Sequence, residues 1–426
     1  MPLYLARAFI SFLMEHSELI PHLFRTEYRK IVAVLCKLFG IDHIEIAEDI
    51  VSNTFLQAAE LWGVKGPPAN PAGWLYTASK NKTRDYLKRN SNFAQNISKE
   101  LRHITPTTDE IEIDLSDRNI SDSQLAMIFV TCHPCNPAEA QIGLALNLLC
   151  GFGIEEIARA FLTNREVIYK RLQRAKEKLR EERIKIESPT LAEIDERLSS
   201  VLMTLYLLFN EGYYSASEDV TLRKELCLEA MRLTYLLTEH AQTNKPEVSA
   251  LLSLMCFHSS RFDARLGHHG ETILYHEQDR DLWNQELIAK GEYFLNMASK
   301  GNKLSKFHVE AAIAYWHTVK EDTKEKWENV LQLYNELLVI EYSPMAALNR
   351  TYALSKAYGK EQAIAEAEKI NLSGNHLYHS LMGELYHGVD NSKALIHLQQ
   401  ALDLAKSAAD RNIIADKIAQ LKKSMV

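Results

Sequence analysis

Apolar residues recur at helical spacing along most of this chain, and that periodicity limits the fold more than any other feature. The stretches LFRTEYRKIVAVLCKLFG (residues 23–40) and IEIAEDIVSNTFLQAAELW (residues 44–62) both show it. After residue 190 the pattern continues as a long series of segments separated by short breaks. Such periodicity is typical of amphipathic helices, and only 16 glycines and 11 prolines interrupt 426 residues. We predict an all-α fold, divided into several domains because one core cannot serve so long a chain.

Charge is distributed unevenly along the chain. Residues 1–189 hold 24 Lys and Arg and 24 Asp and Glu, so the net charge of −7 comes from residues 190–426. A basic surface can therefore exist on the N-terminal half. No apolar run reaches the roughly 20 residues that span a membrane, and the first residues lack the basic start of a signal peptide. We expect a cytoplasmic protein that does not enter the membrane. The regular pattern begins near Met14, so the native start is Met1 or Met14.

The six cysteines are scattered, which favours a reducing compartment over a disulfide framework. Cys132 and Cys135 form a CxxC in the run CHPC. A zinc site of this kind needs a second ligand pair at a defined spacing, and none lies nearby. We therefore favour a turn that leads into a helix. The histidines also lack a spacing such as HExxH, and we predict no metal and no cofactor.

A basic helix is predicted after the break GPPANPAGW. The segment WLYTASKNKTRDYLKRN (residues 74–90) combines an apolar stripe with a row of cations. The stripe is expected at Trp74, Leu75, Ala78 and Leu87. The cations project elsewhere, and they are Lys80, Lys82, Arg84, Lys88 and Arg89.

Residues 91–122 are polar, poor in aromatics and acidic toward the end, which predicts a linker with little structure of its own. Its late acidic residues are Asp109, Glu110, Glu112, Asp114 and Asp117.

The segment GFGIEEIARAFLTNREVIYKRLQRAKEKLR (residues 151–180) divides into a short amphipathic helix, the turn LTN and a longer basic helix. The longer helix carries one apolar stripe, formed by Ile168, Leu172, Ala175 and Leu179. This is either a helix-turn-helix that binds DNA or a solvated charged helix in a bundle. Leu162 stands where such turns often hold glycine, so the turn cannot use glycine's freedom at positive φ.

The C-terminal part contains a repeat-like pattern. In YHSLMGELYHGVDNSKALIHLQQALDLA (residues 378–405), small and aromatic residues approximate the tetratricopeptide pattern of about 34 residues, with one residue missing between the helices. The pattern rests on Gly383, Tyr386, Ala394, Leu398 and Ala401. Stacked helix pairs of this kind form a concave surface, which either binds a protein or ligand or remains a plain helical array.

Two of these stretches resemble the sigma-70 factors of bacterial RNA polymerase, within them the extracytoplasmic-function (ECF) group. AEDIVSNTFLQAAELW with WLYTASKNKTRDYLKR resembles region 2, and residues 151–180 resemble the region 4 helix-turn-helix. LMTLYLLFNEGYYSASED and HEQDRDLWNQELIAKG resemble the ECF subgroup with a large tetratricopeptide-like extension. The resemblance implies four parts: region 2 at residues 14–90, an acidic linker at 91–122, region 4 at 123–188 and a regulatory extension at 190–426.

The resemblance also implies which residues contact which partner. In region 2, reading and opening of the −10 element are assigned to Trp74, Tyr76, Lys80, Asn81, Arg84, Lys88 and Arg89. In region 4, bases of the −35 element are assigned to Arg165, Glu166, Tyr169 and Lys170, and its phosphates to Arg171 and Arg174. Core polymerase is expected to contact Asp49, Asn53 and Gln57, at steps of four on one helical face. Ser52-Asn53 departs from the Gln-acidic pair usual in the group, which leaves the strength of this contact open.

The resemblance implies a factor that is not an enzyme and that lends promoter specificity to core polymerase, with its extension either inhibiting or supporting that activity. The linker would thread a positively charged channel of the polymerase or act as a plain tether. One alternative is a helix-turn-helix repressor or activator with a helical-repeat sensor, which would have no use for residues 74–90. Another is a tetratricopeptide-like scaffold.

Overall fold

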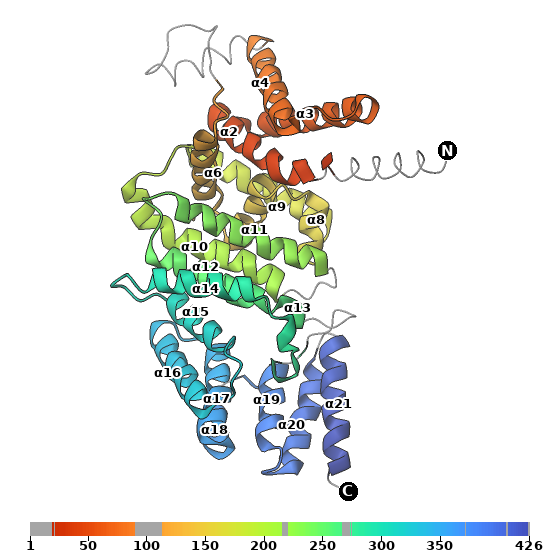
Figure 1. Ribbon diagram of the computed structural model, residues 1–426. Helices are drawn as coiled ribbons and strands as arrows, with labels where there is room; N and C mark the ends of the chain where they lie inside the picture. Colours follow the sequence, from red (N-terminus) through yellow and green to blue (C-terminus); the bar gives the residue numbers. More distant parts are fainter. Residues whose placement is uncertain are drawn as a thin grey trace, which may run out of the picture. The chain divides into compact units, whose positions relative to one another are not determined.

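The computed structural model describes residues 19–20, 22–89, 113–214, 220–265, 273, 275–370, 372–405 and 408–424. Throughout these residues the regular structure is helical and contains no strand, so the predicted all-α fold is confirmed (Figure 1). None of the described helices is long and apolar enough to cross a membrane. The chain forms two compact units, residues 1–208 and 209–426, and the division falls within α10. The two units are described separately.

The first unit opens with the helices that hold the region 2-like sequence. Its elements are a π-helical turn, Phe24–Tyr28, then α2, Arg29–Phe39, α3, Ile44–Lys65, and α4, Pro71–Arg89, with a 3-10 turn, Ile41–His43, before α3. α2 is almost wholly buried and packs against α3, and α3 packs against α4. Gly66 ends α3 with φ of 76° while its N–H bonds to Trp62 O, 2.9 Å. This left-handed conformation suits glycine and begins the loop that turns the chain into α4.

The rest of the first unit is a second set of helices. They are α6, Asp117–Thr131, α7, Ala138–Leu144, with a π-helical turn, Ala145–Leu149, then α8, Ile154–Ala160, α9, Arg165–Glu181, and the start of α10, Leu191–Tyr213. α6 packs against α2, so the two sets of helices share one core. α10 joins this core as well, because Thr204 donates to Gln141 Oε1, 2.5 Å, and Arg197 donates to the carbonyl of Phe129.

α6 begins inside the segment predicted to be a linker. Ser116 caps the helix and donates its N–H to Asp114 Oδ1, 2.8 Å, and its hydroxyl to Asp114 Oδ2, 3.1 Å. These bonds hold the pKa of Asp114 below its ordinary value. Asp114 and Asp117 therefore belong to a helix start rather than to an unstructured tether, whereas Asp109, Glu110 and Glu112 lie outside the described residues.

The CxxC forms the predicted turn. Cys132 follows the last turn of α6, the N–H of Cys135 bonds to His133 Nδ1, 3.2 Å, and α7 begins soon after. Cys132 is buried, and burial raises the pKa of its thiol to about 11. The described residues contain no cluster of His, Cys, Asp and Glu that could hold a metal ion.

The second unit is a succession of packed helices. They are α11, Val220–Glu239, α12, Pro246–Ser260, α13, Phe262–Arg265, α14, Gln285–Ala298, α15, Lys306–Trp316, α16, Lys324–Ile340, α17, Pro344–Tyr358, α18, Lys360–Ala367, α19, His376–Tyr386, α20, Asn391–Leu404, and α21, Ala408–Ser424. Two 3-10 turns, Tyr275–Glu277 and Arg280–Leu282, lie between α13 and α14. Neighbours in the chain pack as pairs, such as α16 with α17 and α19 with α20.

The close approach expected at Gly383 is present between α19 and α20. A Cβ at Gly383 would lie 2.7 Å from the Leu398 side chain and 3.4 Å from the carbonyl oxygen of Ala394. A larger residue would force the two helices apart. The small residues of the repeat-like pattern therefore set the spacing of this helix pair.

Candidate nucleic-acid interface

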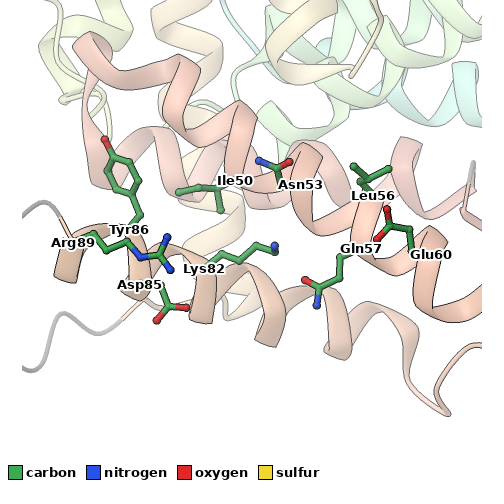
Figure 2. Close-up of a pocket in the computed structure, with 9 residues that line it drawn as sticks. All are labelled: Ile50, Asn53, Leu56, Gln57, Glu60, Lys82, Asp85, Tyr86 and Arg89. Atoms are coloured by element: carbon green, nitrogen blue, oxygen red, sulfur yellow. The ribbon is translucent and has the colours of Figure 1, made fainter.

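A groove of about 500 Å³ lies between α3 and α4. Its walls are Ile50, Asn53, Leu56, Gln57 and Glu60 from α3 and Lys82, Asp85, Tyr86 and Arg89 from α4 (Figure 2). The groove combines apolar side chains with amides and with charges of both signs. It can therefore take a partner segment that is itself partly apolar and partly charged.

The three residues predicted to contact polymerase lie along α3, and two of them line this groove. Asp49 and Asn53 are exposed, and Gln57 is half-buried. Leu56, which the sequence reasoning did not single out, lies beside them with 59% of its surface exposed. The signal in the sequence was its spacing of three from Asn53, which places it beside the predicted contact face.

The cations of α4 are placed largely as predicted. Arg84, Lys88 and Arg89 are exposed, Asn81 is exposed beside them, and Lys80 is half-buried. Because these side chains follow one solvent-facing side of the helix, α4 presents a basic surface that can follow a nucleic-acid backbone.

The buried stripe of α4 differs from the expectation. It consists of Leu75, Ser79, Thr83 and Leu87, whereas Trp74 and Ala78 are only half-buried. Thr83 is accommodated because its hydroxyl donates to the carbonyl of Ser79, 2.8 Å, so burial leaves that group satisfied. Apolar side chains alone do not mark this buried stripe, because two of its four positions hold hydroxyl residues.

The two aromatic residues assigned to the −10 element are both tied into the fold. The ring of Trp74 meets Trp62 edge to face at 5.4 Å. The hydroxyl of Tyr76 donates to Glu27 Oε2, 2.5 Å, and Glu27 also pairs with Lys30, 3.0 Å. Burial and then this hydrogen bond raise the pKa of Tyr76. Trp74 keeps part of its ring surface for stacking, while the polar end of Tyr76 is already occupied.

The short helix, turn and long helix form at the predicted positions, with α8 and α9 joined through residues 161–164. Asn164 caps α9 by accepting the N–H of Val167, 2.9 Å. Leu162 has φ of 49° although it is not glycine. The turn therefore keeps the left-handed geometry that glycine would suit, and Leu162 adopts it at a steric cost.

The N-terminal half of α9 faces solvent on the predicted side. Ile168, Leu172, Ala175 and Leu179 are all buried, which confirms the predicted stripe. The exposed set is Arg165, Glu166, Tyr169, Lys170 and Arg174. Arg171 differs from the others in being half-buried, where it pairs with Glu139, 2.8 Å, and lies over the ring of Phe161. Arg165 also pairs, with Glu155, 3.4 Å, but both of those side chains stay exposed. Five of the six assigned residues can reach a partner, and Arg171 is engaged inside the protein.

The C-terminal half of α9 is tied to α3. Lys176 is 8% exposed and pairs with Glu48, 2.7 Å. Arg180 pairs with Glu45, 2.5 Å, and donates to the carbonyl of Ile41, 3.3 Å. Burial works to raise the pKa of Glu45, but the hydrogen bond from Arg180, a backbone hydrogen bond and the charges of Lys176 and Arg180 together outweigh it, so the pKa lies below the ordinary value. These pairs were not predicted. The signal for Lys176 was its spacing of four from Leu172 and three from Leu179, which places it on the buried face.

Comparisons with known proteins agree with this arrangement. Residues 23–93, which contain α2 to α4, match the family Sigma-70 region 2. The match identifies a sigma-70 region 2 domain in the first unit and supports membership of the sigma-70 family. The family is non-enzymatic, and region 2 supports a sigma-factor-like role in transcription initiation, which implies binding to core RNA polymerase and promoter DNA.

The chain is also similar to other proteins beyond region 2. Residues 197–299 match a family of unknown function (DUF6596), across the division between the two units. Uncharacterized protein R00370 of Rhizobium meliloti (strain 1021) is 32% identical over 387 residues, which covers 89% of this chain and 90% of that protein. No solved structure matches the chain.

Proposed function

We propose that this chain is an ECF-type sigma factor that binds core RNA polymerase, recognises −35 and −10 promoter elements, and is regulated by its own C-terminal helical-repeat extension. The observation that carries the proposal is the presence, in one unit, of a region 2 match and a second basic helix whose N-terminal half is exposed. A repressor that binds duplex DNA without polymerase would need only the basic helix and not region 2.

The α3 face supports the polymerase contact. Asp49, Asn53 and Gln57 are spaced by one helical turn, and exposed Leu56 adds an apolar contact. In this role α3 binds the polymerase clamp and leaves α4 free for DNA. The basic surface of α4 then holds the −10 strand through its phosphates, and Asn81, with both a donor and an acceptor, reads a base edge.

The exposed half of α9 supports −35 recognition. A recognition helix enters the major groove by its N-terminal end, and that end carries Arg165, Glu166, Tyr169 and Lys170. Arg174, one turn further on, is suited to a phosphate. Arg171 is better described as a positioning residue, since it already pairs with Glu139.

A transcription assay tests the proposal directly. The full chain is mixed with core RNA polymerase and fragmented genomic DNA of the source organism, and transcript 5′ ends are sequenced. Discrete starts that share −35 and −10 motifs are the expected result. Arg84→Gln should lower transcript yield from these starts, whereas Lys185→Gln, an exposed lysine beyond α9, should not. DNA binding without polymerase and without any transcript would favour the repressor alternative.

The sign of the extension's effect needs a truncated chain. A cut at residue 189 would remove α10, whose Arg197 and Thr204 hold α6 and α7. A chain that ends after Tyr214 retains those contacts and removes the rest of the second unit. New transcripts from this chain would mean that the extension inhibits, and lost transcripts would mean that it is required. Unchanged output under all conditions would contradict regulation in cis.

A further inference from the structure

Two cations are buried beside one aromatic ring in the second unit. Lys326, in the first turn of α16, is 1% exposed, and Arg261, which follows α12, is 7% exposed. The Lys326 Nζ and the Arg261 guanidinium carbon each lie 5.4 Å from the ring centre of Tyr275. Burying one charge is unfavourable, and burying two of the same sign together is more so.

Neither cation has an acidic partner in the part of the chain that the structure describes. Among the described residues, no carboxylate oxygen lies within 4.0 Å of Lys326 or Arg261. Lys326 donates to the hydroxyl of Tyr275, 3.0 Å, and to the carbonyl of Val319, 2.7 Å, which are both neutral. Asp322 is near, but it already accepts from Trp327 Nε1 and from Lys356, 3.0 Å. Burial lowers the pKa of Lys326 to about 8.

Hydrogen-bond donors without partners gather around the same ring. Buried nitrogens of three side chains lack a partner among the described residues: Arg261 Nε, Trp283 Nε1 and His317 Nδ1. The Tyr275 ring centre is 6.4 Å from that of Trp283 and 5.1 Å from that of His317. Trp283 is only 3% exposed. Arg261 Nε and Trp283 Nε1 always carry a hydrogen, and His317 Nδ1 carries one in one of its two neutral tautomers. Buried donors are normally satisfied, so these nitrogens indicate a missing acceptor.

One class of ligand would supply both the missing negative charge and the missing hydrogen-bond acceptors. An oxyanion brings negative charge to Lys326 and Arg261 and several acceptor oxygens to the indole and imidazole nitrogens. We propose that the cluster of Arg261, Trp283, His317 and Lys326 around Tyr275 is a binding site for a small oxyanion, a phosphate or a carboxylate. The proposal concerns the second unit alone and does not depend on the sigma-factor role.

Thermal unfolding of the full chain tests the site, with inorganic phosphate and acetate as probes against chloride at matched ionic strength. Phosphate or acetate should raise the unfolding midpoint in a saturable way, because a ligand that binds the folded state stabilises it. Lys326→Met should weaken the apparent affinity by about tenfold or more, the size expected for one hydrogen bond to a charged group. Lys324→Gln, on the same helical turn but exposed, should leave the affinity unchanged.

A milder variant covers the case in which Lys326→Met does not fold. Trp283→Phe keeps an aromatic ring but removes the indole N–H together with part of the buried ring volume, so the chain should fold with a somewhat lower unfolding midpoint and bind the probe less tightly. The proposal is overturned if neither probe gives a saturable shift in the unaltered chain. It is also overturned if Trp283→Phe and Lys324→Gln bind as the unaltered chain does, because the probe would then occupy another site.

Discussion

At the scale of single residues, Leu162 shows a conflict between backbone geometry and side-chain type. Its φ of 49° lies in the left-handed region, and 64% of its side chain is exposed. Exposure means that little burial compensates for the strain. The turn between α8 and α9 is therefore held in place by its surroundings, chiefly the cap of α9 at Asn164 and the bond from Thr163 N to Ala158 O, 2.9 Å.

Replacing Leu162 by glycine should stabilise the protein. The left-handed conformation costs a residue with a Cβ about 1–2 kcal/mol, and glycine's greater freedom when unfolded offsets part of the gain. We expect the free energy of unfolding, measured by urea denaturation, to rise by roughly 0.5–1 kcal/mol in Leu162→Gly. Leu162→Ala is the control, since alanine keeps the Cβ and should bring no such gain. An equal gain in both variants would mean that strain is not the cause.

Single residues also show which features of the fold a sequence predicts and which it does not. The helices of the described residues and the stripe of α9 were predictable because apolar periodicity reports the buried face directly. Ser79 and Thr83 on α4 were not, since hydroxyl residues carry no apolar signal. The hydroxyl of Thr83 is satisfied by its own helix, whereas that of Ser79 has no partner among the described residues. The pair of Lys176 with Glu48 joins residues 128 positions apart, and no local pattern in one sequence specifies which distant acid a buried lysine meets.

At the scale of the element, the N-terminal half of α9 faces solvent and its C-terminal half is paired with α3. Arg174 is exposed, while Arg171, three residues away, is half-buried against Glu139. From the sequence both were assigned to phosphates, because both are positively charged and lie close together on the same helix. Only the packing of α7 against α9 separates them.

Salt dependence should distinguish these two arginines. Each phosphate contact contributes close to one to the slope of log affinity against log salt. Arg174→Gln should therefore reduce that slope by about one for duplex promoter DNA. Arg171→Gln should instead lower the stability of the fold and leave the slope near that of the unaltered chain. A reduced slope in Arg171→Gln would show that its pair with Glu139 opens when DNA binds.

At the scale of the whole first unit, the contact between α9 and α3 depends on pH. The folded-state pKa of Glu45 lies below its ordinary 4.5. The bond to Arg180 therefore stabilises the fold above that pH and is lost as the pH falls through the folded-state pKa.

A double-mutant cycle of Glu45→Gln and Arg180→Gln measures this dependence. Both side chains are partly exposed, so the coupling at neutral pH should be modest, about 0.2–1 kcal/mol. It should shrink once the pH drops below 4.5. A coupling that stays constant through this range would exclude the ionised carboxylate as its source.

The contact of Lys176 with Glu48 also limits how far the exposed end of α9 can lie from the groove between α3 and α4. At 1.5 Å per residue, Arg165 lies about 17 Å along α9 from Lys176, whose ammonium is 2.7 Å from Glu48. The groove shared by α3 and α4 begins at Ile50, just beyond Glu48. In the proposed role, α9 and α4 bind two separate elements of one duplex, which rises about 3.4 Å per base pair.

While these ion pairs are intact, α9 stays against α3, so the two helices proposed to bind DNA keep one fixed separation. A promoter whose elements are spaced differently would require α9 to leave α3, and Lys176 and Arg180 would then need new negative partners. In the proposed role, polymerase or DNA would supply them in place of Glu48 and Glu45. The ion pairs between α9 and α3 would thereby limit which promoter spacings the chain can use.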